Sequence, residues 1–156
     1  MKTIFIVDDN DTNLLMAKQA LDGSYRAFAL QSAEKMFGLM EKITPDLILL
    51  DVEMPVMDGL TALTALKENV YTANIPVIFL TAYISDALEA EALKVGAADF
   101  ITKPFSQPVL LNRIEQQLKI ADLNKQLEYF YEVSQKILGG DFEEAASMIR
   151  KLYRVE

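Results

Sequence analysis

The chain of 156 residues contains neither cysteine nor histidine. Without cysteine it can form no disulfide bond and carry out no thiol chemistry. The missing histidine excludes a histidine general base, a histidine metal ligand and a phosphohistidine on this chain. No stretch approaches the roughly 20 apolar residues of a membrane-spanning helix, and the N-terminus has no long apolar run typical of a signal peptide. We therefore expect a cytoplasmic protein with no membrane partner.

Basic residues are also fewer than acidic residues. Lysine and arginine total 15 against 23 aspartates and glutamates, which gives a formal net charge of −8. Because nucleic acids are bound through clustered lysine and arginine, we expect no direct nucleic-acid partner. The hydrophobic fraction of 51% can form a core, and 24% charged residues are typical of a folded soluble protein. The length suits one domain with an appendage.

Short apolar runs alternate with helical patterns over the first 119 residues. The runs predict strands over Thr3–Val7, Tyr25–Leu30, Leu47–Leu50, Val77–Leu80 and Asp99–Thr102. Helices are predicted over about 12–22, 32–44, 59–69, 85–96 and from 106 onward. Five β-α repeats joined by right-handed crossovers predict the α/β class, with a five-stranded doubly wound parallel sheet and helices on both faces.

Polar and reactive residues follow four of these strands. Asp8 and Asp9 come after the first strand, Asp51 after the third, Thr81 after the fourth and Lys103 after the fifth. In a parallel sheet the carboxyl ends of the strands share one edge, where ligands bind near the switch in strand order. Taken singly, each residue has an ordinary explanation as a helix cap, a turn or a solvated charge. All five at one edge instead predict a site.

Three converging carboxylates repel one another, and without a cation the pKa of at least one should be raised. A hard divalent ion with oxygen ligands relieves this repulsion, and Mg²⁺ suits a site with few carboxylates. A carboxylate can also attack phosphorus to give an acyl phosphate. A lysine and a metal ion would neutralise the charge of the transferring group.

Four segments resemble the CheY-like receiver domains of response regulators in two-component signalling. They are IFIVDDND, LILLDVEMPVMDG, PVIFLTA and GAADFITKPF, in the order and at the separations of that family. The resemblance covers residues 1–119 and implies a flavodoxin-like receiver domain there. It also implies phosphoryl transfer to Asp51 from a sensor histidine kinase or a phosphotransfer protein. Such a domain is not an enzyme, because it promotes only its own phosphorylation and dephosphorylation.

The resemblance assigns the metal ligands. Asp9 and Asp51 are expected to bind Mg²⁺ directly, together with the backbone carbonyl of Glu53, while Asp8 acts through water. These assignments are expectations of the resemblance and do not follow from the spacing.

The resemblance also assigns the residues around the phosphoryl group. Thr81 is expected to donate a hydrogen bond to the phosphoryl group once it has arrived, and Lys103 to pair with it. The Lys103–Pro104 peptide is expected to be cis. Phe100 occupies the aromatic switch position, where many members have a tyrosine, so a contact that needs the hydroxyl is lost. Glu53 and Tyr83 can shape the access of water, or can be ordinary loop residues.

Three other functions fit the sequence less well. Asp9-Asn10-Asp11 is similar to the Asp-x-Asp of haloacid-dehalogenase-like phosphohydrolases, but that assignment leaves Asp51 and the MPVMDG segment unexplained. An inert receiver-fold dimerisation module would be expected to lack some of the site residues, but all of them are present in this sequence. The Gly139-Gly140-Asp141-Phe142-Glu143 segment is similar to a diguanylate cyclase signature, but it has two letters exchanged and too few residues after it. The segment is better explained by two glycines that end one helix, followed by Asp141 and Glu144 as the capping box of the next helix.

Residues 120–156 form a predicted helical extension. One helix continues from about 106 to 138, roughly 50 Å at ~1.5 Å per residue, and a short helix follows over 141–154. Apolar residues follow 3-4 spacing, with Ser134 interrupting them. They are Ile120, Leu123, Leu127, Phe130 and Ile137. Either two chains pair along this stripe as a parallel homodimer, which we favour, or the last helix folds back on it; alternatively the helix leads to an output domain.

Overall fold

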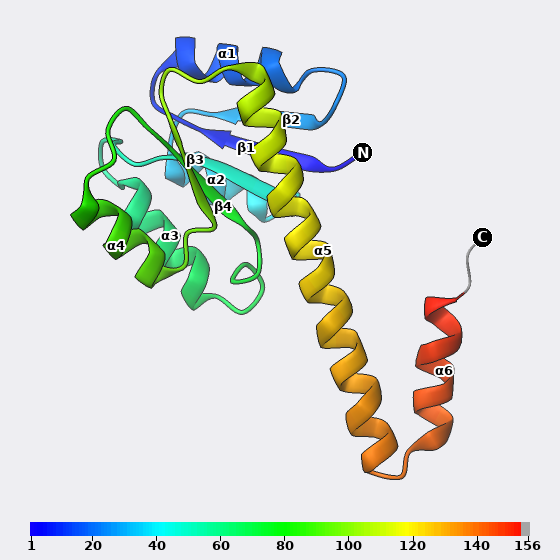
Figure 1. Cartoon of the computed structure of the whole chain (residues 1–156). Coiled ribbons are helices and arrows are strands. Elements are labelled where there is room, and N and C mark those ends of the chain that lie inside the picture. The colour runs from blue at the N-terminus through cyan, green and yellow to red at the C-terminus, as the bar shows by residue number, and fades with distance from the viewer. Residues whose placement is uncertain (154–156) are drawn as a thin grey trace. The chain divides into compact units, whose positions relative to one another are not determined.

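The computed structural model describes residues 1–153 (Figure 1), and their contacts divide the chain into two compact units, residues 1–118 and the residues from 119 onward. The strands and helices of the first unit are β1 (Thr3–Val7), α1 (Asp11–Leu21), β2 (Arg26–Leu30), α2 (Ala33–Met40), β3 (Leu47–Asp51), α3 (Gly59–Glu68), β4 (Val77–Thr81), α4 (Asp86–Val95) and β5 (Asp99–Thr102). Helix α5 (Gln107–Leu138) runs from the first unit into the second, which also holds α6 (Phe142–Leu152). No helix in this described part of the chain is long and apolar enough to cross a membrane.

The five strands form one parallel sheet in the order β2-β1-β3-β4-β5, which confirms the predicted fold class. The order reverses between β1 and β3, which are neighbours. Val7 pairs with Leu50 in their register, so the next residues, Asp8 and Asp51, reach the same level at the edge of the sheet. The switch in strand order therefore lies where the reactive residues were predicted to converge.

Both faces of the sheet are covered, which explains strands that are apolar without alternation. The core on one face packs strand residues such as Phe5, Ile48 and Phe79 against Met36, Leu63 and Ala92 of the helices α2, α3 and α4. The core on the other face packs Ile6, Leu49 and Leu80 against Leu14, Leu21, Leu110 and Ile114 of α1 and α5.

Capping side chains and one glycine mark ends of the helices in the first unit. The side chains of Asn10, Ser32, Asp58 and Ser85 each accept a hydrogen bond from a backbone N–H in the first turn of α1, α2, α3 and α4. Gly96 ends α4 in the left-handed conformation, with φ of 117°. These local signals fix the lengths of the helices and hence the loops that carry the site.

In the second unit, only half of the predicted capping box forms. The backbone N–H of Glu144 donates to Oδ1 of Asp141 at 3.2 Å, as expected for an N-cap. The Glu144 carboxylate does not return to Asp141, because it accepts a hydrogen bond of 2.7 Å from Nζ of Lys136. The backbone N–H of Asp141 donates instead to the carbonyl of Lys136. The predicted end of this helix at residue 154 lies outside the described residues.

Helix α6 folds back on the C-terminal part of α5. The hydroxyl of Tyr129 donates to the carbonyl of Met148 at 2.5 Å, and Val133 and Ala145 are buried. This contact does not cover the predicted apolar stripe, whose residues remain exposed. They are Ile120, Leu123, Leu127, Phe130 and Ile137. The fold-back prediction is therefore right about the helix and wrong about the surface that it buries; the division into two domains at residue 119 stays a prediction.

Gly59 lets the start of α3 approach the end of β3. Its backbone N–H donates to the carbonyl of Val52 at 2.8 Å. A Cβ atom at this position would lie 2.3 Å from the carbonyl oxygen of Asp51 and 2.8 Å from Cα of Val52. Both neighbours are backbone atoms that cannot rotate away, so only glycine fits beside Asp51.

Replacing Gly59 with alanine is expected to lower the free energy of unfolding by about 1–3 kcal/mol, the usual cost of overpacking. Gly38→Ala is the matched control, because Gly38 lies inside α2 with nothing within 4 Å of an added Cβ. That variant should gain about 0.5–1 kcal/mol from its higher helix propensity. Urea denaturation of both variants measures the difference, and equal effects would contradict the close approach at Gly59.

Candidate functional site

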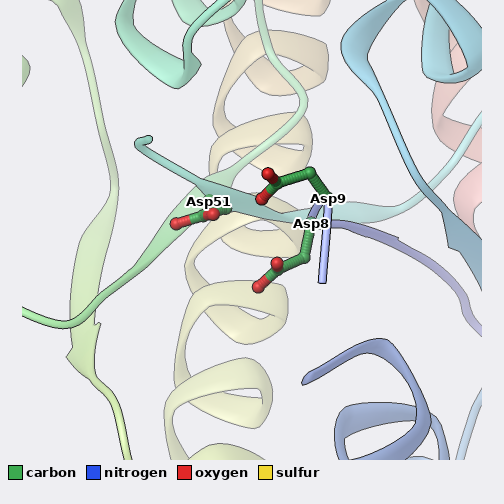
Figure 2. Close-up of side chains that lie close together, drawn as sticks. All are labelled: Asp8, Asp9 and Asp51. Atoms are coloured by element: carbon green, nitrogen blue, oxygen red, sulfur yellow. The ribbon is translucent and has the colours of Figure 1, made fainter. Parts of the chain in front are cut away.

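Three carboxylates converge at the carboxyl edge of the sheet (Figure 2). Asp51 is the last residue of β3, and Asp8 and Asp9 directly follow β1. One carboxylate oxygen from each residue lies within 4.8 Å of the others. Asp8 and Asp51 are buried, at 1% and 6% exposure, whereas Asp9 is exposed. The predicted convergence is thus present, with one open carboxylate beside two buried ones.

Asp8 is held by the protein on both of its oxygens. Oδ1 accepts a hydrogen bond of 2.9 Å from the backbone N–H of Asn10. Oδ2 accepts hydrogen bonds from Nδ2 of Asn13 at 3.2 Å and from Nζ of Lys103 at 2.6 Å. The role of Asn13 was not predicted from the sequence; the available signal was its place in the first turn of α1, beside the end of β1. These three donors fix the position of the Asp8 carboxylate.

Lys103 is the cation of the site. Its Nζ lies 2.6 Å from Oδ2 of Asp8 and 3.1 Å from Oδ1 of Asp51. Burial alone would lower the pKa of Lys103, but its hydrogen bonds to Asp8 and Asp51 and their negative charges outweigh burial, so the pKa is raised. Lys103 is therefore charged at neutral pH. Three carboxylates and one ammonium leave the cluster with a formal charge of −3 + 1 = −2.

Burial raises the pKa of the Asp51 carboxyl above its ordinary value, and the neighbouring charge of Asp8 raises it further. The hydrogen bond and charge of Lys103 act in the opposite direction without cancelling these effects. The ionised form of Asp51 is thus less stable here than in water. A further cation near Asp8, Asp9 and Asp51 would stabilise it.

Thr81 ends β4, and its side chain is engaged with the loop that follows. The hydroxyl donates to the carbonyl of Tyr83 at 2.9 Å and accepts a hydrogen bond of 3.3 Å from the backbone N–H of Tyr83. The hydroxyl has one proton to donate, and here it donates that proton to a carbonyl of the loop between β4 and α4. The side chain of Tyr83 is 75% exposed. The structure brings Thr81 to the predicted edge of the sheet with its hydroxyl bound to this loop.

The remaining predicted residues lie around this centre. Phe100 of β5 is partly buried, with its ring centroid 5.8 Å from that of Phe79. The Lys103–Pro104 peptide is cis, as expected. The side chain of Glu53 is exposed and outside the carboxylate cluster, so the expected role of its backbone carbonyl stays a prediction.

A pocket of about 340 Å³ opens beside Lys103. Its lining is mostly apolar and comes from α1 and from the segments after β4 and β5. The lining residues are Asn13, Met16, Ala82, Lys103, Pro104 and Phe105. The charged cluster is therefore flanked by a mostly apolar hollow in the surface.

Comparison with known proteins gives a consistent assignment. The sequence model of the response regulator receiver domain family matches residues 4–115. A probable cyclic di-GMP phosphodiesterase of Vibrio cholerae is 37% identical over 117 residues, which cover 75% of this chain and 26% of that protein. The polar-differentiation response regulator DivK of Brucella ovis is 30% identical over 118 residues, which cover 75% of this chain and 96% of that protein.

A solved structure supports the same fold. The CheY-like response regulator receiver domain protein from Methanospirillum hungatei superposes with a TM-score of 0.74 at 27% identity, over 80% of this chain and 98% of that one. The chain spans 25% to 52% of the length of the first six curated relatives. Neither the site nor these relatives favours a haloacid-dehalogenase-like phosphohydrolase or an inert module. The chain belongs to the response regulator receiver domain family, whose members accept a phosphoryl group on an aspartate in two-component signalling.

Proposed function

We propose that Asp51 is the phosphoacceptor of this chain, and that its donor is the phosphohistidine of a sensor histidine kinase or a phosphotransfer protein. One observation carries the proposal: Asp51 is the last residue of the middle strand and lies buried 3.1 Å from Lys103, whereas both oxygens of Asp8 already accept hydrogen bonds from the protein and Asp9 is exposed. These 156 residues contain no histidine, so the phosphohistidine of the donor lies outside them. In this proposal the reaction occurs in the cytoplasm, and these residues promote only the phosphorylation and dephosphorylation of Asp51.

In the proposed transfer, a carboxylate oxygen of Asp51 attacks the phosphorus of the donor. A new O–P bond forms while the P–N bond of the phosphohistidine breaks. The electron pair of that bond remains on the imidazole nitrogen, and the product on this chain is an acyl phosphate. Lys103 keeps its positive charge beside Asp51 and stabilises the negative charge of the phosphoryl oxygens.

The residues present fit Mg²⁺. The cluster offers carboxylate oxygens, which this hard ion prefers, and its formal charge of −2 matches a divalent cation. Both oxygens of Asp8 already accept hydrogen bonds from the protein. This supports an indirect role for Asp8 through water. Asp9 and Asp51 would then bind the ion directly, and we assign the backbone carbonyl of Glu53 to it as a further ligand. The bound ion would supply positive charge that stabilises the transferring phosphoryl group.

Thr81 supplies a route from phosphorylation to a change of conformation. Its hydroxyl proton, now donated to the carbonyl of Tyr83, would be donated to a phosphoryl oxygen instead. The loop between β4 and α4 would then lose this anchor. Phe100, packed on Phe79 and without a hydroxyl, can respond by changing its rotamer alone.

Phosphorylation separates the roles of Asp51 and Thr81. With acetyl phosphate and Mg²⁺, the Asp51→Ala variant should gain no phosphoryl group in intact-mass spectra, because the nucleophile is gone. Thr81→Ala should be phosphorylated but should lose the shift of the Tyr83–Ser85 amide resonances that phosphorylation causes in the unchanged protein. The matched control is Thr102→Ala, since Thr102 pairs with Thr81 at the same level of β5 and should behave as the unchanged protein.

Two results would count against these roles. Phosphorylation of Asp51→Ala to the level of the unchanged protein would move the acceptor elsewhere, as a haloacid-dehalogenase-like mechanism at Asp9 requires. Identical behaviour of Thr81→Ala and Thr102→Ala in the amide spectra would remove Thr81 from the switch.

Metal binding is testable without phosphorylation. Mg²⁺ at about 10 times its Kd should raise the free energy of unfolding by ~1.4 kcal/mol through binding to the folded state alone. Asp9→Asn and Asp51→Asn should lose most of this gain. In EDTA, Asp51→Asn should instead be more stable than the unchanged protein by about 1 kcal/mol, because it relieves a close like-charge contact.

The control for the metal measurement is Asp58→Asn. Asp58 is an exposed N-cap outside the cluster, and asparagine caps a helix about as well. It should keep the whole Mg²⁺ effect. An equal Mg²⁺ effect in all four proteins, measured by thermal or urea unfolding, would show that the ion binds elsewhere.

A further inference from the structure

The part of α5 beyond residue 119 carries an apolar stripe that the rest of its unit leaves exposed. Its apolar residues lie between 43% and 65% exposed and follow strict 3-4 spacing, and Ser134 takes the remaining position of the pattern. The stripe consists of Ile120, Leu123, Leu127, Phe130, Ser134 and Ile137. A spacing that averages 3.5 residues is the repeat of a left-handed two-stranded coiled coil.

Helix α6 packs on another side of α5. The contacts that join these helices come from Tyr129, Val133 and Lys136, which reach Met148 and Glu144 or are buried in the hairpin. None of these three residues belongs to the stripe, but Val133 flanks it, so α6 packs along one edge of the stripe while the stripe's apolar residues stay exposed. The hairpin is therefore formed while the stripe is still open, so α6 does not compete for it in the described part of the chain.

The charges along the stripe favour a second copy of the chain. The protein carries a net charge of −8, yet no acidic residue occupies the stripe or the positions that flank it in the heptad. The flanking residues are Lys119, Asn124, Gln126, Tyr131, Val133 and Leu138. Asp122, Glu128 and Glu132 occupy the other heptad positions. Two acidic chains can thus meet along this surface without opposing carboxylates.

We propose that two copies of this chain pair in parallel through the stripe as a short coiled coil. A second copy has the same repeat, so in a parallel pair each apolar residue of the stripe packs against the same residue of the other copy. In the parallel arrangement Ser134 lies opposite Ser134 of the other copy. An antiparallel arrangement would set Ser134 against Leu123 at two levels of the contact, so the small side chain, whose hydroxyl donates to the carbonyl of Tyr131, would interrupt the apolar contact twice and not once. This pairing is independent of Asp51 and goes beyond the phosphorylation proposed above.

Sedimentation of the unphosphorylated full chain over a dilution series tests the pairing. The unchanged protein should be a dimer at high concentration, and Leu127→Glu combined with Phe130→Glu should weaken dimerisation at least about 100-fold, since charges would be buried in the contact. The matched control is Lys125→Gln combined with Gln135→Glu, which changes the net charge by the same −2 on the outer side of the helix. Circular dichroism and phosphorylation by acetyl phosphate verify that each variant is folded.

The absence of cysteine makes the orientation measurable. Ser134→Cys should form an intermolecular disulfide under mild oxidation in a parallel dimer, and Gln135→Cys, on the outer side, should not. In an antiparallel pair the introduced thiols of the Ser134→Cys variant would lie roughly 16 Å apart, at ~1.5 Å per residue over the offset of about eleven residues, beyond disulfide reach.

Each outcome of these experiments either supports or overturns the proposed pairing. A dimer that depends on Leu127 and Phe130 and crosslinks through position 134 supports the proposal. A monomer at every concentration overturns it, and so does a dimer that the double glutamate variant leaves intact, because pairing then uses another surface. A stripe-dependent dimer without a crosslink at position 134 overturns the parallel arrangement.

Discussion

The contact of one lysine with two buried aspartates is the interaction on which the site depends. Nζ of Lys103 lies 2.6 Å from Asp8 and 3.1 Å from Asp51, in a position that is largely closed to water. Without that ammonium, two carboxylates would face each other in a medium that stabilises charge poorly. The lysine offsets only part of the negative charge. The remainder is what a divalent cation can neutralise, and the same ammonium can then stabilise an incoming phosphoryl group.

The register of the strands brings the residues of this contact together. Asp8, Asp51 and Lys103 come from segments far apart in the sequence. The pairing of β1 with β3 brings Asp8 and Asp51 to one level, and the pairing of β3 through β4 with β5 places Lys103 two residues beyond that level, from where its Nζ contacts both carboxylates. Gly59 completes the arrangement, since any larger residue would push the start of α3 away from the backbone of Asp51. The two cores that flank the sheet hold these strands rigidly, so that charge can be concentrated at one edge.

The sequence was sufficient for the sheet and its edge but not for the local partners. Apolar runs such as Leu47–Leu50 locate strands, and the end of a buried parallel strand locates a reactive residue without further information. The hydrogen bond of Thr81 with Tyr83 and that of Asn13 with Asp8 join residues only two and five positions apart, but they depend on side-chain rotamers and on loop conformation, which the apolar pattern does not specify. The same holds for Glu144, which pairs with Lys136 across the hairpin where local spacing predicted a bond within its own turn.

The central claim is that the carboxylate of Asp51 becomes an acyl phosphate. Reductive trapping tests it most directly: the protein is phosphorylated in the presence of Mg²⁺ by a phosphotransfer protein carrying phosphohistidine, treated with borohydride and digested, and its peptides are identified by mass spectrometry. Borohydride converts an aspartyl phosphate to homoserine, so the account predicts homoserine at position 51 and nowhere else. Homoserine at position 8 or 9, with unmodified aspartate at 51, would contradict it.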